Sequence, residues 1–174
     1  MMHPLLLCVF FLFRPMLCLG DEIPTRFGVI AFTDQQLLIS FNENVAFGQH
    51  HYLAHAKKSA NLMEEVREKL ETAVDETKSI LEMFPEDLSF KIVLLPTAVA
   101  VRRVYREIYN TPSEFIAFYS PQKKTIFLSV NDVQLRVLIH EIAHVVMDFY
   151  FGVAPSVKIH EVLAQYAESH FAGD

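Results

Sequence analysis

Cysteine is scarce in this chain, and both copies, Cys8 and Cys18, fall within the first twenty of its 174 residues. If these residues are removed as a leader, the remaining protein has no disulfide and no thiol nucleophile. This excludes a small disulfide-stapled module. It favours a single domain held together by its own core, for which a hydrophobic content of 52% is sufficient.

Positive charge is also limited. Lys and Arg number 15 against 21 Asp and Glu, which gives a net charge of −6, and no basic stripe runs along the sequence. A phosphate backbone would need such a stripe, so we expect no nucleic acid partner. Arg102, Arg103 and Arg106 form a local basic patch that we interpret as a solvated helix face, with docking to an acidic partner as the alternative.

The chain lacks a hydrophobic run suited to a membrane span. Residues 5–19, LLLCVFFLFRPMLCL, form an apolar leader that Arg14 and Pro15 interrupt, whereas a span needs roughly 20 apolar residues. The leader and the following Gly20 are typical of a signal peptide. We therefore expect residues 1–20 to be removed and residues 21–174 to form one exported domain, periplasmic or secreted. The alternative is an uncleaved leader that anchors the protein in a membrane through residues 5–19.

What the chain does contain is a His-Glu-x-x-His motif, His140-Glu141-Ile142-Ala143-His144. Side chains four residues apart lie on one face of a helix, so the two imidazoles can converge on one ion. Zinc accepts neutral imidazole, and Glu141 is placed to act as a general base on a zinc-bound water. We predict that His140 and His144 are zinc ligands and that Glu141 is catalytic.

The surrounding residues 132–150, DVQLRVLIHEIAHVVMDFY, favour a largely buried helix. We expect Asn131 or Asp132 to cap its start, and Gly152 lies where it should end. Two histidines and a glutamate in such a helix are costly without partners, which supports a metal site. The alternative is a pair of hydrogen-bonded core histidines beside a surface glutamate.

A catalytic zinc site uses three protein ligands and leaves one position for water. Residues 156–171, SVKIHEVLAQYAESHF, are typical of an amphipathic helix that begins near Pro155 and Ser156. An antiparallel return of this helix would bring Glu161, in its second turn, over the histidine pair. Glu161 is therefore the best candidate for the third ligand.

These residues resemble the gluzincins, thermolysin-like zinc metallopeptidases in which a glutamate from a following helix joins the two motif histidines. Family members often carry Glu-x-x-Ala-x-Tyr on that helix, and Glu161, Ala164 and Tyr166 follow this pattern. The resemblance implies one Zn²⁺ ion held by His140, His144 and Glu161. The short sequence after Glu161 is similar to the minigluzincins, which reduce the fold to two motif helices and a small sheet.

The resemblance implies an α+β, zincin-like fold, and the order of the elements agrees with it. We expect a small mixed sheet with an antiparallel edge strand, a long backing helix, an active-site helix and a C-terminal glutamate helix. In residue numbers, the patterns predict a hairpin over 27–32 and 37–41, a long helix over 51–84 ended by Pro85, a strand over 90–95, a basic helix over 97–109, and strands over 115–119 and 125–130.

In the gluzincins an edge strand borders the cleft and pairs with the peptide substrate. Ile116-Ala117-Phe118-Tyr119 is similar to the Asn-Ala-Phe-Trp sequence of that strand. The resemblance implies that Ala117 and Tyr119 bind substrate, as an exposed strand edge does through main-chain hydrogen bonds. An ordinary hairpin with an aromatic face packed on the core is the alternative.

Two features depart from the family pattern. Many members have an acidic residue four positions after the ligand glutamate that orients the first motif histidine, but this chain has Gln165 there and Glu168 one turn further along. We also expect no counterpart, after the glutamate helix, of the family's C-terminal subdomain, which often supplies an oxyanion-stabilising Tyr or His. Tyr150, Tyr166 and His170 remain as candidates for that role.

His51 and His55 are also four residues apart, but they lack the intervening glutamate. We interpret them as a solvated first turn of the long helix, with a second metal site as the alternative.

The resulting hypothesis is a small exported zinc endopeptidase or aminopeptidase-like hydrolase that acts on peptides or proteins. Two alternatives remain. One is a non-catalytic, zinc-stabilised module that holds a peptide at the edge formed by residues 117–119. The other is a membrane-tethered accessory protein that keeps its leader.

Overall fold

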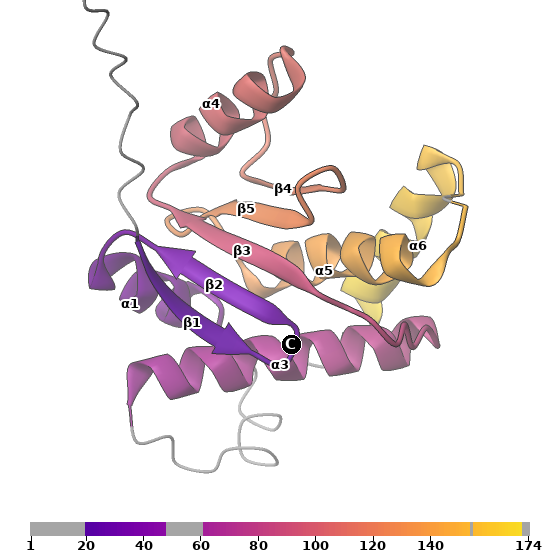
Figure 1. Cartoon of the computed structure of the whole chain (residues 1–174), viewed down its shortest axis with the longest axis horizontal. Helices are drawn as coiled ribbons and strands as arrows, with labels where there is room; N and C mark the ends of the chain where they lie inside the picture. Colours follow the sequence, from indigo (N-terminus) through magenta and orange to yellow (C-terminus); the bar gives the residue numbers. More distant parts are fainter. Residues whose placement is uncertain (1–19, 48–60, 154, 172–174) are drawn as a thin grey trace, which may run out of the picture.

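The structure, a computed structural model, describes residues 20–47, 61–153 and 155–171, which form an α+β domain built on a five-stranded mixed sheet (Figure 1). The strand order is β1-β2-β3-β5-β4. Neighbours β2, β3 and β5 run parallel, and the two edge strands β1 and β4 are antiparallel to their partners. The predicted fold class, a small mixed sheet with an antiparallel edge strand, is confirmed. The strands are β1 (Asp21–Thr25), β2 (Gly28–Phe32), β3 (Phe90–Leu95), β4 (Ala117–Ser120) and β5 (Thr125–Ser129).

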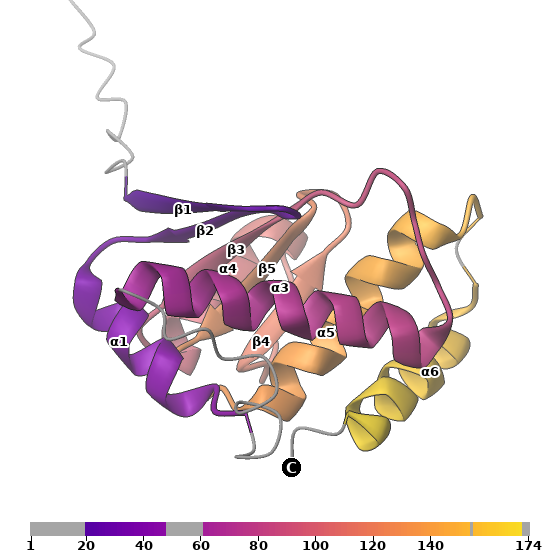
Figure 2. The same ribbon diagram turned by 90° about the horizontal axis from the view of Figure 1, so that it is seen from below.

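Helices cover both faces of this sheet (Figures 1 and 2). On one face pack α1 (Gln35–Asn44), α3 (Leu62–Leu81) and α5 (Leu135–Tyr150), and α6 (Val157–His170) packs in turn on α5 and α3. The other face carries α4 (Ala98–Tyr109). Ile30, Ile92 and Ile126 are register partners on β2, β3 and β5 and are fully buried, so the main core lies between the sheet and the first group of helices.

The predicted hairpin of residues 27–32 and 37–41 is wrong. Strand β2 pairs instead with β1, and residues 37–41 belong to α1. The reason is local: the Asp34 side chain accepts hydrogen bonds from the N–H groups of Gln36 and Leu37, which caps a helix start where the sequence had indicated a turn. Leu37, Leu38 and Phe41 then share one helix face and are buried.

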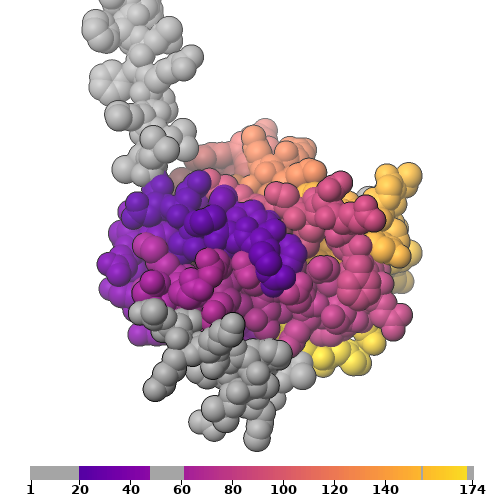
Figure 3. Space-filling view, turned by 60° about the horizontal axis from the view of Figure 1, so that its bottom comes forward, coloured from indigo at the N-terminus to yellow at the C-terminus, as the bar shows by residue number. Residues whose placement is uncertain are grey.

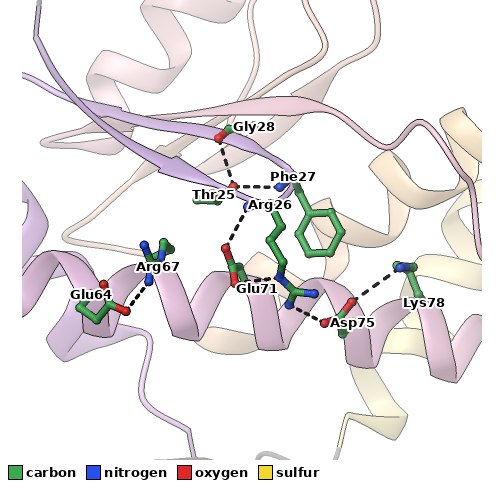
Figure 4. Close-up of polar contacts among 9 residues, drawn as sticks. All are labelled: Thr25, Arg26, Phe27, Gly28, Glu64, Arg67, Glu71, Asp75 and Lys78. Carbon is green, nitrogen blue, oxygen red and sulfur yellow. Dashed lines mark hydrogen bonds and ion pairs between the residues drawn. The ribbon is translucent and has the colours of Figure 1, made fainter. Parts of the chain in front are cut away.

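The turn between β1 and β2 is fixed by two different contacts. Arg26 pairs with Glu71 at 2.9 Å and with Asp75 at 2.7 Å, which ties the turn to α3 (Figure 4). Gly28 adopts φ +126°, and a Cβ there would lie 1.8 Å from the carbonyl oxygen of Phe90. Only glycine can adopt this φ and also leave room for the Phe90 carbonyl oxygen. The hairpin of β1 and β2 lies alongside α3 on one face of the molecule (Figure 3).

The long helix is confirmed over the part of it that is described. Its N-cap is Asn61, whose side chain accepts from the Glu64 N–H, and it ends at Leu81 with Glu82 in the left-handed region, before the predicted end at residue 84. The predicted first part of this helix, with His51 and His55, lies outside the described residues, as do the leader residues 1–19. None of the described helices is both long and apolar enough to cross a membrane.

The second half of the chain follows the predictions closely. Strand β3 has the predicted bounds, and Thr97 caps α4 by accepting from the Ala100 N–H. The motif helix α5 begins later than expected, after Gln134, which makes no side-chain cap. The predicted cap Asp132 has another role: it accepts hydrogen bonds from the Ser129 hydroxyl and from the Ala98 N–H, which joins β5 to the start of α4.

Candidate metal centre

The motif histidines lie on α5, a helix that is buried along most of its length. Leu138, Ile139, Ile142 and Met147 are at most 1% exposed, and they anchor the helix in the core. Helix α6, which follows α5 in the chain, packs against it. His140 and His144 are half-buried on the side of α5 that faces Glu161 of α6.

The three predicted ligands converge. Nε2 of His140 lies 3.2 Å from Nε2 of His144. The two carboxylate oxygens of Glu161 lie 3.5 Å from these nitrogens, Oε2 from His140 and Oε1 from His144. This His-His-Glu group can hold a metal ion.

The spacing of these atoms fits a small tetrahedral ion. Bonds of about 2.0–2.2 Å at tetrahedral angles put ligand atoms about 3.3–3.6 Å apart. The two nitrogens are close to this range at 3.2 Å, and each nitrogen lies 3.5 Å from its own oxygen of Glu161. Two imidazole nitrogens and a carboxylate oxygen are also a donor set that zinc accepts. The residues present therefore fit a three-ligand site with a fourth position open.

Glu168 orients the first histidine. Its Oε2 lies 3.3 Å from Nδ1 of His140, and its Oε1 accepts from Arg136 at 3.2 Å. Because a carboxylate accepts hydrogen bonds, Nδ1 of His140 donates, which leaves the lone pair on Nε2 for a metal. Gln165 is exposed, and among the described residues its side chain has no hydrogen bond. The orienting carboxylate thus comes from Glu168, three residues beyond Gln165 on α6.

The second histidine has a different environment. The pKa of His144 is lowered from 6.5 to about 4, first by burial and then by the neighbouring His140 and His160. Its ring stacks on that of His160, with ring centroids 5.8 Å apart and planes 13° from parallel. A neutral imidazole at neutral pH is the form that binds a metal.

Glu141 is held beside the ligands by the edge strand. It is 8% exposed, and its Oε2 accepts a 2.7 Å hydrogen bond from the main-chain N–H of Tyr119. Burial raises the pKa of Glu141 from 4.5 to about 7 and Glu161 adds to the rise, while the Tyr119 N–H opposes it. A carboxyl with a pKa near 7 suits proton transfer at neutral pH.

Strand β4 presents alternate main-chain groups to this site. The carbonyl of Ile116 accepts from Ser129 beside β5, whereas the Tyr119 N–H points the other way, to Glu141. By strand alternation the polar main-chain groups of Ala117 also face the free edge. Ala117 is 5% exposed, and it lines the cavity that contains the motif histidines.

The Tyr119 side chain reaches across to α5. Its hydroxyl donates a 2.7 Å hydrogen bond to Oδ2 of Asp148, four residues after His144. Burial, followed by this hydrogen bond, raises the pKa of the Tyr119 phenol above its ordinary value. Tyr119 therefore joins β4 to α5 twice, through its main chain and through its side chain.

A cavity of about 630 Å³ connects these groups. Its floor is α5, and Pro155, Val157, His160 and Glu161 form one wall. The other wall is largely aromatic and is contributed by α4, β4 and the residues just before and just after β4. Its lining residues are Tyr105, Tyr109, Phe115, Ala117, Phe118, Tyr119 and Pro121.

The predicted oxyanion donors are not among the residues that line this cavity. Tyr150 is 49% exposed and packs on Phe151, and Tyr166 is 46% exposed and stacks on His170 at a centroid distance of 4.0 Å. Tyr166 lies outside the cavity because α6 turns Ala164 and Ala167 toward the core and Tyr166 away from it.

Sequence reasoning also missed residues that the fold brings to the cleft. Asp148 and His160 line the cavity, as do Tyr105 and Tyr109 of α4. The sequence carried a signal for Asp148, which shares a helix face with His144 by its spacing of four. It carried none for α4, because nothing in its sequence indicates which side of the sheet it covers.

No family model, curated protein or solved structure with which the chain was compared matches it.

Proposed function

We propose that this protein is a zinc-dependent peptidase of gluzincin type in which His140, His144 and Glu161 hold one Zn²⁺ ion and Glu141 is the general base. The observation that carries the proposal is the convergence of three side chains in one cleft: the two histidine Nε2 atoms are 3.2 Å apart, and each lies 3.5 Å from a different carboxylate oxygen of Glu161. An adjacent buried carboxyl and a neighbouring strand edge supply the other parts that peptide hydrolysis needs.

The chemistry divides between the ion and the chain. Zinc, when bound, supplies Lewis acidity that polarises a carbonyl and lowers the pKa of water toward about 7. Glu141 takes a proton from the attacking water while the oxygen of that water bonds to the scissile carbonyl carbon. It gives that proton to the amine nitrogen as the carbon–nitrogen bond breaks, which returns Glu141 to its carboxylate form.

Two other residues set the geometry for this step. The Tyr119 N–H fixes the Glu141 carboxylate through the 2.7 Å hydrogen bond, so the base keeps its place relative to the histidines. The main chain of Ala117, on the same strand edge, would pair with an extended peptide that enters the cavity, which Ala117 lines. Binding and proton transfer would thus depend on one short strand.

One observation favours a second function, peptide binding without cleavage. Tyr150, Tyr166 and His170 do not line the cavity, so none of the predicted oxyanion donors is placed to stabilise the transition state. A zinc-stabilised module of this kind would bind peptides at the β4 edge and release them intact.

The test is the Glu141→Gln variant, assayed with zinc bound against a library of internally quenched peptides. We expect one zinc per chain to be kept and cleavage to fall about 10²–10⁴-fold, the usual contribution of a general base. Glu86→Gln, an exposed carboxyl far along the chain from the motif, is the matched control and should cleave normally.

Two outcomes would contradict the proposal in different ways. Unchanged turnover in Glu141→Gln would remove Glu141 from the mechanism. Wild-type protein that holds zinc and binds peptides but cleaves none would establish the binding module instead.

A further inference from the structure

The aromatic wall of the cleft is built around Tyr105. Its ring lies 5.1 Å from that of Phe115 and 5.0 Å from that of Phe118, in edge-to-face geometry, and 4.7 Å from that of Tyr109. Beneath them Phe118 stacks on Phe127 at 5.1 Å. Such contacts fix each ring in place, so the wall is a rigid surface before any ligand arrives.

This cluster is exposed to the cleft rather than closed over. Phe115 is 47% exposed, Tyr105 and Tyr109 are half-buried, and all three line the same cavity as the His-His-Glu group. A group of aromatic rings that is fixed but partly open to solvent gains free energy by covering its surface. Because these rings line the same cavity as the His-His-Glu group, we expect the group that covers them to be part of the ligand that binds at the metal site.

The charge of the cleft indicates which ligand side chains it favours. Glu141, Asp148 and Glu161 line the cavity, and no lysine or arginine does so among the residues that the structure describes. Such a cleft disfavours an acidic side chain, and its aromatic wall favours a ring.

Strand geometry explains how a peptide would reach this wall. The side chains of Ala117 and Tyr119 face α5, because Ala117 belongs to the main core and Tyr119 bonds Asp148. Phe118, between them, points to the side of the sheet that carries α4. In an extended peptide paired with β4, side chains alternate in the same way, so one of every two successive residues faces the aromatic cluster.

We propose that residues Tyr105, Tyr109, Phe115 and Phe118 form a specificity subsite that selects peptides with an aromatic side chain next to the metal-bound group. This inference rests on the proposed function, because it needs the peptide and the metal in one cleft. It assigns to α4 a role in substrate choice, in addition to covering the sheet.

The experiment uses zinc-loaded full-length protein and three peptides that bind through a hydroxamate: acetyl-Ala-Ala-, acetyl-Phe-Ala- and acetyl-Ala-Phe-hydroxamate. Affinities come from calorimetry after zinc content has been confirmed by elemental analysis. We expect one of the two Phe peptides to bind at least about 10-fold more tightly than the Ala-Ala peptide, because a ring is covered on aromatic partners.

Two variants and one control locate the effect. Tyr105→Ala should abolish most of the preference for the Phe peptide over the Ala-Ala peptide. Phe115→Ala, which removes an exposed ring from a loop, should reduce the preference even if Tyr105→Ala proves poorly folded. Tyr150→Ala removes an equally exposed aromatic ring outside the cavity and should keep the full preference.

The outcomes separate this inference from the proposed function. Equal affinity for the three peptides in zinc-loaded wild type, or a Phe preference that survives both variants, would overturn the subsite while the metal centre stands. A Phe preference in a protein that never cleaves peptides would support the subsite and contradict the peptidase. Protein without zinc and without hydroxamate affinity would overturn both.

Discussion

The main-chain N–H of Tyr119 donates a 2.7 Å hydrogen bond to Oε2 of Glu141, which joins edge strand β4 to the middle of helix α5. This contact couples the two halves of the cleft: the strand that we propose to pair with a peptide also holds the carboxylate that we propose as the base. Because the Tyr119 hydroxyl bonds Asp148 on the same helix, the strand cannot shift along α5 without breaking two hydrogen bonds. The base and the strand edge are therefore positioned as one unit.

Glu161→Ala should remove the metal. The two histidines alone leave a site with one ligand too few, so we expect about one zinc per chain in wild type and a loss of affinity of at least about 100-fold in the variant. Glu161 is 47% exposed in its side chain, so its truncation should leave the fold intact. Elemental analysis after gel filtration measures the difference. Gln165→Ala, exposed on the same helix, is the control, and equal zinc content in both variants would exclude Glu161 as a ligand.

Glu168→Gln should weaken zinc binding without abolishing it. The carboxylate accepts from Nδ1 of His140, and loss of such a partner typically costs about 10–100-fold in metal affinity. Competition against a chromophoric chelator gives the affinities. Gln165→Ala should bind zinc as wild type does, because the Gln165 side chain has no hydrogen bond to either histidine. A larger loss in Gln165→Ala than in Glu168→Gln would reverse this assignment.

The sequence predicted the metal centre better than the cleft around it. His140, Glu141 and His144 are fixed relative to one another by helical geometry, and the loop after α5 is short enough that Glu161 can only return nearby. The sequence could not show whether Glu168 or Gln165 orients His140. The two positions are less than one helical turn apart, and only the packing of α6 determines which of them faces the histidine. Walls built from distant segments, such as Tyr105 on α4, depend on tertiary contacts that no local pattern encodes.

The N-terminal part shows the same limit at the level of secondary structure. Residues 37–41 have the composition of a short strand. They form a helix instead, because the Asp34 side chain caps its start by accepting hydrogen bonds from Gln36 and Leu37. Strand β1 was not predicted, because its sequence DEIPT is polar and contains a proline. It lies at the sheet edge, where a missing N–H is tolerated.

The metal-free protein should lose stability as the pH rises because of Glu141. Its pKa is about 7 in the folded state and 4.5 ordinarily, so the folded state binds the proton more tightly. The associated stability is present below pH 4.5 and is lost as the pH rises through 7. Between pH 5 and pH 8 this amounts to about 2 kcal/mol.

The Glu141→Gln variant isolates this effect, because it cannot ionise and its amide oxygen can still accept from the Tyr119 N–H. Urea unfolding in excess chelator at both pH values gives the two free energies. We expect the variant to become more stable relative to wild type at pH 8 than at pH 5. A difference between the two proteins that is the same at both pH values would contradict a raised pKa at Glu141.

Gly28→Ala should destabilise the fold strongly. The backbone at Gly28 has φ +126°, which an L side chain rarely adopts, and an added Cβ would lie 1.8 Å from the Phe90 carbonyl oxygen on β3. Because that neighbour is backbone, the methyl group can be accommodated only if β2 and β3 separate. They lie beside each other in the centre of the sheet, so we expect a loss of more than about 2 kcal/mol in the free energy of unfolding.

Gly152→Ala provides the comparison for this prediction. A Cβ at Gly152 meets no atom within 4 Å, so the same substitution there should change the stability by less than about 1 kcal/mol, toward greater stability because it reduces the entropy of the unfolded chain. Urea unfolding of both variants at one pH measures the two changes. If both variants unfold at the same denaturant concentration, the requirement for glycine at position 28, where the β2 and β3 backbones approach closely, would be contradicted. The turn would then depend mainly on the pairing of Arg26 with Glu71 and Asp75.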